Sequence, residues 1–154
     1  FFVELIFIAE AMAPKALQVG RFLPPTPIRI LLDKGSNNLA DNVAFDAFNQ
    51  QLSAVGRQTA SKLASALQSA IHPMITSAQG MAQTKLETLR AESLEKMQTA
   101  LGEEQARLTA LKQINPNIRD EELSFFDKQR SELTTYIEKA QVKLDAIRLI
   151  VVSH

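Results

Sequence analysis

The chain has 154 residues, of which 45% are hydrophobic and 22% are charged, and its formal net charge is zero. This length and composition predict one globular domain rather than a disordered segment. A neutral chain is not expected to hold nucleic acid mainly by neutralising phosphates. Cysteine is absent from the sequence, which excludes disulfides and thiolate metal sites and fits a cytoplasmic location.

The first ten residues predict a β-strand. Side chains alternate between two faces there, and both faces carry β-branched or aromatic residues, so we expect both to be covered. A proline-rich connection follows over residues 14–27, and residues 28–33 predict a second strand that ends at a Lys-Gly turn. Residues 38–52 have apolar positions at helical spacing after an asparagine cap and predict a short helix.

Residues 57–147 predict two long antiparallel helices joined by an Asn-Pro-Asn turn at 115–117. In the first helix, apolar residues recur at a spacing of about 3.67 residues per turn, which gives a nearly straight stripe. The rows of this stripe are Leu67, Ala78, Leu89, Ala100 and Leu111, and Ile75, Leu86, Met97 and Leu108. The second helix alternates steps of three and four residues up to Ile147. Pro73 should bend the first helix without ending it, because it removes one backbone donor.

The chain closes with a β-branched segment, and residues 148–152 predict a third strand that returns to the first two. The expected fold class is therefore α+β, with a small antiparallel sheet built from both termini and a long antiparallel helical hairpin. Within one domain of residues 1–154, we expect strands and a short helix over 1–56, the hairpin over 57–147 and the returning strand at 148–152. The apolar start of the chain is too short to cross a bilayer, so no membrane partner is expected.

No pattern in the sequence is typical of a catalytic, cofactor or metal site. The five glycines are scattered, and none precedes the Lys-Ser or Lys-Thr pair of a phosphate-binding loop. The two histidines, His72 and His154, are far apart in sequence, whereas a metal site needs several converging ligands. The acidic run at 120–122 suits the first turn of a helix, where it complements the helix dipole. We therefore expect no catalytic, cofactor-binding or metal-binding residue in this chain.

Three residues of the second predicted helix are candidates for contact with a protein partner. Phe125 is followed by another phenylalanine, and two adjacent side chains cannot both face the first helix. With Tyr136 eleven residues later, Phe125 forms a second apolar flank that is either covered by more protein or exposed for a partner. Arg130 interrupts the apolar stripe; it binds a partner, extends past the first helix to solvent, or pairs with a carboxylate such as Glu92 or Glu95.

Three stretches of the sequence resemble a known family. They are residues 13–18 running on to the proline-rich segment and strand at 21–33, the hairpin turn at 115–123, and the closing segment at 144–152. In this order, over nearly the whole chain, they are similar to the C-terminal region of the RapA family. Members of that family are bacterial RNA polymerase-associated, SWI/SNF-like ATPases that help to recycle the polymerase.

The resemblance implies that this chain, which begins without methionine, is a piece of a longer parent protein. The family's nucleotide-binding and helicase-type motifs lie upstream of the matching region, so ATP and Mg²⁺ belong to the parent's motor domains. No cofactor and no catalytic residue is carried over to this chain. The parent is implied to hydrolyse ATP, contact DNA and bind RNA polymerase in the cytoplasm. This chain would then be a non-catalytic domain that docks RNA polymerase, or that packs on the parent's own ATPase domains and regulates them.

Two other functions stay open at this point, and an independent enzyme is the least favoured. A local basic patch would contact DNA or RNA weakly and with strong salt dependence. Its residues would be Arg21, Arg29 and Lys34 near the second strand, or Lys139 and Lys143, four apart on one predicted helix face. Alternatively, the chain is a purely structural domain that the parent needs for folding.

Overall fold

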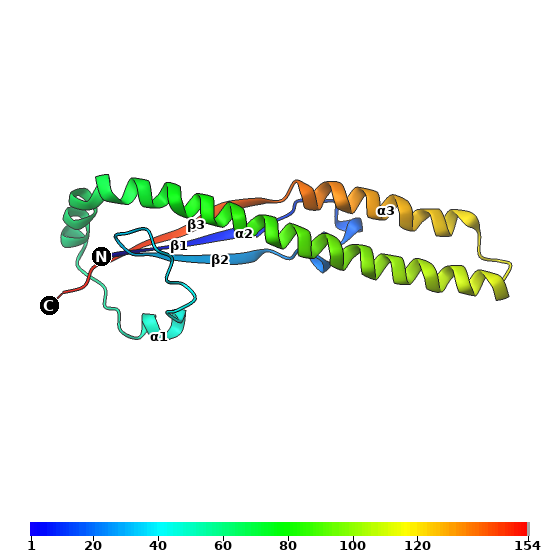
Figure 1. Ribbon diagram of the computed structural model, residues 1–154, viewed down its shortest axis with the longest axis horizontal. Coiled ribbons are helices and arrows are strands. Elements are labelled where there is room, and N and C mark those ends of the chain that lie inside the picture. Colours follow the sequence, from blue (N-terminus) through cyan, green and yellow to red (C-terminus); the bar gives the residue numbers. More distant parts are fainter. Residues whose placement is uncertain (154) are drawn as a thin grey trace. The chain divides into compact units, whose positions relative to one another are not determined.

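The computed structural model, described for residues 1–153, combines a three-stranded antiparallel sheet with helices (Figure 1). The strands are β1 (Phe2–Glu10), β2 (Thr26–Leu32) and β3 (Gln141–Ile150), in the order β2-β1-β3. The α-helices are α1 (Phe45–Asn49), α2 (Arg57–Ile114) and α3 (Asp120–Glu138), and two short 3-10 turns are η1 (Lys15–Leu17) and η2 (Val19–Arg21). The predicted α+β class, with a sheet built from both ends of the chain, is confirmed.

Two compact units share the chain, and α2 runs through both. Unit 1 contains residues 1–8, residues 27–85 and the chain from Val142 onward, and so holds nearly all of the sheet. Unit 2 contains residues 9–26 and 86–141, and so holds the second half of α2, α3 and both 3-10 turns. Within residues 1–153, no helix is long and apolar enough to cross a membrane.

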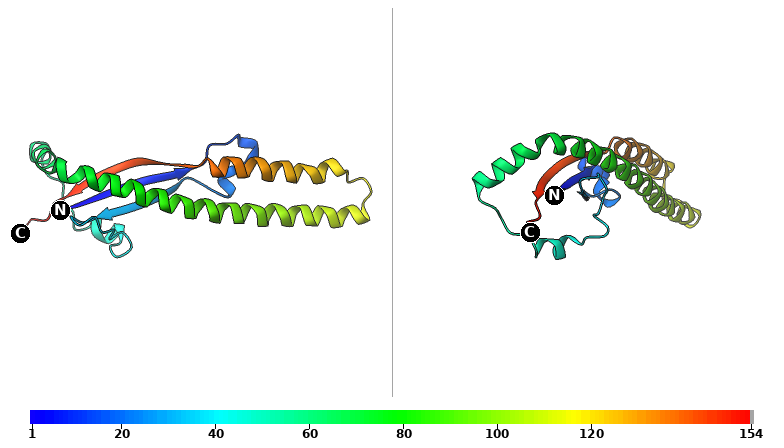
Figure 2. Two further views of the ribbon diagram at one scale, coloured as in Figure 1. Left: turned by 45° about the horizontal axis from the view of Figure 1, so that its top comes forward. Right: turned by 60° about the vertical axis from the view of Figure 1, so that its left-hand side comes forward.

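The core of unit 1 lies between the sheet and the first half of α2, which runs along one face of the strands (Figures 1 and 2). Alternate residues of β1 point to this face, as the period of two predicts. Its buried side chains are Val3, Leu5 and Phe7 of β1, Ile28 and Ile30 of β2, and Met74, Ala78 and Ala82 of α2. The spacing of four residues on α2 keeps these three positions on one side of the helix.

α2 continues through Pro73, as the sequence indicated. The helix is continuous from Arg57 to Ile114. Figures 1 and 2 show its first turns at an angle to the turns that follow. Proline inside a helix removes one backbone hydrogen bond and crowds the preceding turn, which produces a kink.

The short helix predicted for residues 38–52 forms only in part, because α1 covers Phe45–Asn49 and the residues before it are not helical. The side chain of Asn38 accepts hydrogen bonds from the backbone N–H groups of Leu31 and Ala40 at 3.2 and 3.1 Å. These bonds attach the segment to the end of β2, where Leu32 and Asn38 form an isolated bridge. Asn38 therefore binds the edge of β2 and does not cap a helix.

Arg29 also prevents a helix over the start of this segment. Its guanidinium donates hydrogen bonds to the backbone carbonyls of Ala40 and Val43. A helix would need those two carbonyls for its own hydrogen bonds four residues further on. A tertiary contact thus overrides the apolar spacing.

Unit 2 is built around an antiparallel pair of helices, the second half of α2 and α3, which lie side by side (Figures 1 and 2). The turns η1 and η2 pack against α3. The buried side chains of unit 2 are Leu17, Phe22, Leu23, Leu86, Met97, Leu101, Leu133, Ile137 and Ala140. On α3, Leu133 and Ile137 are four apart and so face the same side of the helix.

The boundary between α3 and β3 differs from the prediction. The helix ends at Glu138 and the strand begins at Gln141, whereas the hairpin was expected to reach 147 and the strand to start at 148. Positions 140, 144 and 147 fit the spacing of a helix, but Val142 and Leu144 equally fit the alternation of a strand. Pairing with β1 decides in favour of the strand.

Candidate protein-binding surface

Arg130 joins the two helices of the hairpin. Its guanidinium donates hydrogen bonds to the side-chain oxygen of Gln105 on α2 and, at 2.6 Å, to the carboxylate of Asp127 on α3. The hydrogen bond from Arg130, followed by that from Gln105, lowers the pKa of Asp127. The predicted pairing of Arg130 with Glu92 or Glu95 is wrong, because the hairpin register places Gln105 opposite it. A guanidinium engaged in this way positions the helices.

The hairpin loses its buried core toward the turn. We call residues 102–132 the distal hairpin. No side chain of this segment is fully buried; burial ends at Leu101 on α2 and begins again at Leu133 on α3. In between, Leu108 and Phe126 are half-buried. The distal hairpin therefore consists of two helices that cover each other only partly.

Three large apolar side chains of the distal hairpin are exposed to solvent. Leu111 is 48% exposed, Ile114 is 83% exposed and Phe125 is 60% exposed. Phe125 meets Phe126 edge to face, with ring centroids 6.3 Å apart. Tyr136, the second predicted partner-binding residue on this flank, is half-buried. Large exposed apolar side chains mark a protein-binding surface where they form one patch.

Leu111 and Ile114 were not identified as surface residues from the sequence. Leu111 was assigned to the buried stripe because it continues an apolar row of the first helix. Ile114 immediately precedes the turn at Asn115, and α3 begins only at Asp120. An apolar residue beside a hairpin turn has few neighbours on the facing helix. The closeness of Leu111 and Ile114 to the turn is the sequence signal from which their exposure could have been predicted.

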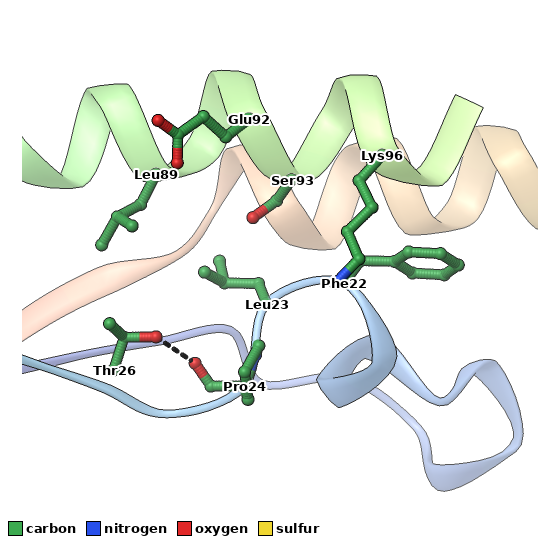
Figure 3. A pocket seen from close by; sticks show the side chains of 8 residues that line it. All are labelled: Phe22, Leu23, Pro24, Thr26, Leu89, Glu92, Ser93 and Lys96. Carbon is green, nitrogen blue, oxygen red and sulfur yellow. Dashed lines mark hydrogen bonds between the residues drawn. The ribbon is translucent and has the colours of Figure 1, made fainter. Parts of the chain in front are cut away.

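A small cavity of unit 2 lies between the turn after η2 and α2 (Figure 3). Figure 3 shows Leu89 and Ser93 directed from α2 toward this turn, where the Thr26 hydroxyl donates to the Pro24 carbonyl at 2.7 Å. Its lining residues are Phe22, Leu23, Pro24, Thr26, Leu89, Glu92, Ser93 and Lys96. The volume is about 180 Å³, below the roughly 300–1,000 Å³ of common small-molecule sites.

A second hollow, of about 300 Å³, is a groove on the surface of α2 alone. It is lined by Ala64, Ser65, Gln68, Ile71, His72 and Ile75. The lining of this groove contains no second histidine, cysteine or carboxylate that could bind a metal ion together with His72. Among residues 1–153 there is no group of three or more His, Cys, Asp or Glu that could hold a metal ion. His154, the other histidine of the sequence, lies outside the described residues.

Glu4 is a buried carboxylate whose partners come from the other two strands of the sheet. Arg29 of β2 donates to it at 2.8 Å and Arg148 of β3 donates at 2.6 Å. Both guanidinium groups lie over the ring of Phe45 in α1, at 5.5 and 5.8 Å from its centroid. We call these four residues the Glu4 cluster. It ties β1, β2, β3 and α1 together: one carboxylate pairs with two guanidinium groups, and Nη2 of Arg29 is buried without a hydrogen-bond partner.

The cations proposed for nucleic-acid binding already have partners in the protein. Arg21 forms an ion pair with Glu104 at 2.6 Å, and Arg29 belongs to the Glu4 cluster. The ammonium of Lys34 lies 5.8 Å from the centre of the Phe1 ring. Ion pairing of Arg21 and Arg29 reduces the charge that either could offer to phosphate.

The second predicted basic pair does not form. Lys139 follows the end of α3, and Lys143 lies within β3. The two residues therefore do not share a helix face, and the prediction that placed them four apart on one helix is wrong. Its cause is the helix–strand boundary described above.

Comparison with known proteins finds a matching family model and similar proteins. A family model described as the C-terminal region of the RNA polymerase recycling family matches residues 1–152. The RNA polymerase-associated protein RapA of Photobacterium profundum is 50% identical over 152 residues. The matched region covers 99% of the present chain and 16% of that protein. The chain thus spans only a small part of the length of this relative.

Proposed function

Because the chain belongs to the RNA polymerase recycling family, as the C-terminal region of that family, we propose that it is a non-catalytic domain that docks RNA polymerase. The proposal places ATP hydrolysis, with its Mg²⁺, and the main DNA contacts in motor domains of a longer parent protein. This chain then needs no cofactor of its own, and it works in the cytoplasm, where the polymerase is. The association with polymerase is taken from the name of the relative.

The distal hairpin is the observation that carries this proposal. Two helices without a fully buried side chain expose Leu111, Ile114 and Phe125 near their turn. Covering a large apolar side chain completely contributes about 1.5–3 kcal/mol, part of which is offset by the freedom lost on association. Three such side chains therefore contribute to docking together with further contacts around them.

The predicted partner-binding residues take different parts in this surface. Phe125 is the central anchor, because aromatic side chains dominate the energy of most protein interfaces. Tyr136 lies eleven residues further along α3, which is close to three helical turns, so it continues the same flank. Arg130 acts indirectly: its bonds to Gln105 and Asp127 hold α2 and α3 in the register that presents Phe125.

Capture on immobilised RNA polymerase tests the proposal. The wild-type chain is compared with Phe125→Ser and with a variant that replaces Leu111, Ile114 and Phe125 by serine. Met12→Ser is the control, since Met12 is 77% exposed and lies outside the distal hairpin. We expect the triple variant to bind at least tenfold more weakly and the control to bind as the wild type does. Circular dichroism confirms that each variant keeps its helices.

Equal capture of the triple variant and the wild type would contradict the assignment of the distal hairpin. The parent protein lacking this chain supplies the second arm. If the isolated chain is not captured, and the shortened parent still binds polymerase with an altered rate of ATP hydrolysis, the chain regulates its own motor domains. That result would replace docking by intramolecular regulation.

A further inference from the structure

β3 forms an open edge of the sheet. It pairs with β1 on one side, and no residue among 1–153 pairs with its other side. The opposite edge of the sheet is partly closed, because the N–H of Leu39 donates to the carbonyl of Leu31 in β2 at 2.7 Å. An open edge presents a row of free N–H and C=O groups that can pair with another strand.

The middle of β3 is exposed on both faces. All side chains from Lys143 to Ile147 are exposed, and among them Leu144 is 41% and Ile147 is 47% exposed. Leu144 and Ile147 point to opposite faces, because successive side chains of a strand alternate. The strand has no proline and no glycine, two residues that interrupt pairing at natural sheet edges. β3 therefore presents an edge with which a further strand can pair.

We propose that β3 pairs with β3 of a second copy of this chain, in an antiparallel arrangement with a two-fold axis at Leu144. The two three-stranded sheets then form one continuous sheet. In this register Leu144 faces Leu144 of the other copy, and Val142 faces Ala146. Lys143 faces Asp145 at both symmetric positions, so each copy supplies one cation and one anion. Cross-strand pairs of opposite charge and of apolar side chains both stabilise a sheet.

The charges on β3 select this register over its neighbours. A two-fold axis perpendicular to a continuous sheet keeps each face of the sheet on the same side. The axis passes midway between the two copies of one residue, and residues that face each other belong to the same face of the sheet. An axis at Asp145 would place that carboxylate opposite itself, which is unfavourable. An axis at Ala146 would place Lys143 opposite Leu149, and Asp145 opposite Ile147. Of these three registers, the axis at Leu144 alone pairs both charges.

A single introduced cysteine tests the pairing directly, because the chain contains no cysteine. Facing residues of antiparallel strands have Cα atoms about 4.5–5.5 Å apart, which lies within the roughly 4.4–6.8 Å range of disulfides. Leu144→Cys should therefore form a covalent dimer under mild oxidation. Ile147→Cys is the matched control, since it is equally exposed. Its two copies would be about 20 Å apart at roughly 3.4 Å per residue.

Charge exchange supplies the second test. Lys143→Asp alone, or Asp145→Lys alone, should weaken dimerisation roughly tenfold or more, because each creates two like-charge pairs. The double variant Lys143→Asp, Asp145→Lys should restore it. Light scattering and sedimentation over a range of concentrations measure the effect, both for this chain and for the longer protein that carries it.

Two outcomes would overturn the proposal. One is a chain that stays monomeric at every concentration, with cross-linking of Leu144→Cys no faster than that of Ile147→Cys. The other is dimerisation of the isolated chain without dimerisation of the longer protein, which would show that another segment of the parent occupies this edge.

Discussion

Glu4→Gln removes the charge at the centre of the Glu4 cluster while keeping the length of the side chain. Glu4 is 3% exposed and accepts hydrogen bonds from Arg29 and Arg148 through its two different oxygens. In glutamine one of these oxygens becomes an NH₂ group, which cannot accept from a guanidinium. The substitution therefore breaks one hydrogen bond and leaves two arginines without their counter-charge.

The size of the effect follows from how well each arginine can return to water. Removing one partner of a buried ion pair costs about 3–5 kcal/mol. The side chain of Arg148 is 38% exposed and can be solvated, whereas that of Arg29 is only 15% exposed. We therefore expect Glu4→Gln to lower the free energy of unfolding by about 2–4 kcal/mol. Arg29→Met should cost more than Arg148→Met, because Arg29 is the more buried partner and also donates to the carbonyls of Ala40 and Val43.

Urea unfolding followed by circular dichroism measures the loss, and hydrogen exchange locates it. The amides of β1, β2 and β3 should lose protection together. Glu10→Gln is the control, because it makes the same chemical change on the same strand, at a carboxylate with no ion pair among residues 1–153. It should change the stability by less than about 0.5 kcal/mol. A change of that small size for Glu4→Gln, or a larger loss for Arg148→Met than for Arg29→Met, would refute the reasoning.

Two further predictions concern unit 2. Leu133 is fully buried on α3, so Leu133→Ala should lower the free energy of unfolding by about 2–5 kcal/mol in urea titrations, and a loss below about 1 kcal/mol would contradict its place in the core. The lowered pKa of Asp127 means that its ionised form stabilises the folded hairpin at pH values above the unfolded pKa of about 4. This stabilisation is lost as the pH falls through the folded pKa. The urea midpoints of the wild type and Asp127→Asn should therefore differ at pH 7 and converge in acid, and a constant difference would exclude the pairing with Arg130.

Sequence periodicity was sufficient to predict the elements whose apolar pattern fits only one type of secondary structure. β1 was predicted within a residue because apolar side chains alternate along its whole length, and β2 was predicted to within two residues at its start. The long helix α2 was predicted through Pro73 because the apolar phase continues beyond the proline. In each case local preference and tertiary packing favour the same structure.

The segments that were predicted wrongly are those in which two patterns fit equally well or a distant contact decides. Positions 140, 144 and 147 suit a helix, but β1 offers a strand partner that no local window contains. Residues 38–52 suit a helix, but Arg29 and Asn38 bind their backbone to β2. Both outcomes depend on residues far away in the sequence, which local spacing does not report.

The candidate site could be predicted only in part for a similar reason. Phe125 was identified because two adjacent aromatic residues cannot share one helix face. Leu111 and Ile114 were not, because their exposure depends on where α3 begins relative to α2. The partners of Arg130 depend on the same helix register, which places Gln105 rather than Glu92 beside it.

The position of β3 in the sequence affects how the protein is made. Glu4 and Arg148, which meet in the folded sheet, are 144 residues apart. A ribosome adds roughly 5–20 residues per second, so roughly 7–30 s pass between the synthesis of these two residues. During that interval the nascent chain can form its helical hairpin from local contacts. Meanwhile the apolar strand β1 has no pairing partner at the edge that β3 later occupies. Closure of the sheet is thus a late event of translation, and until then β1 is a natural target for a chaperone.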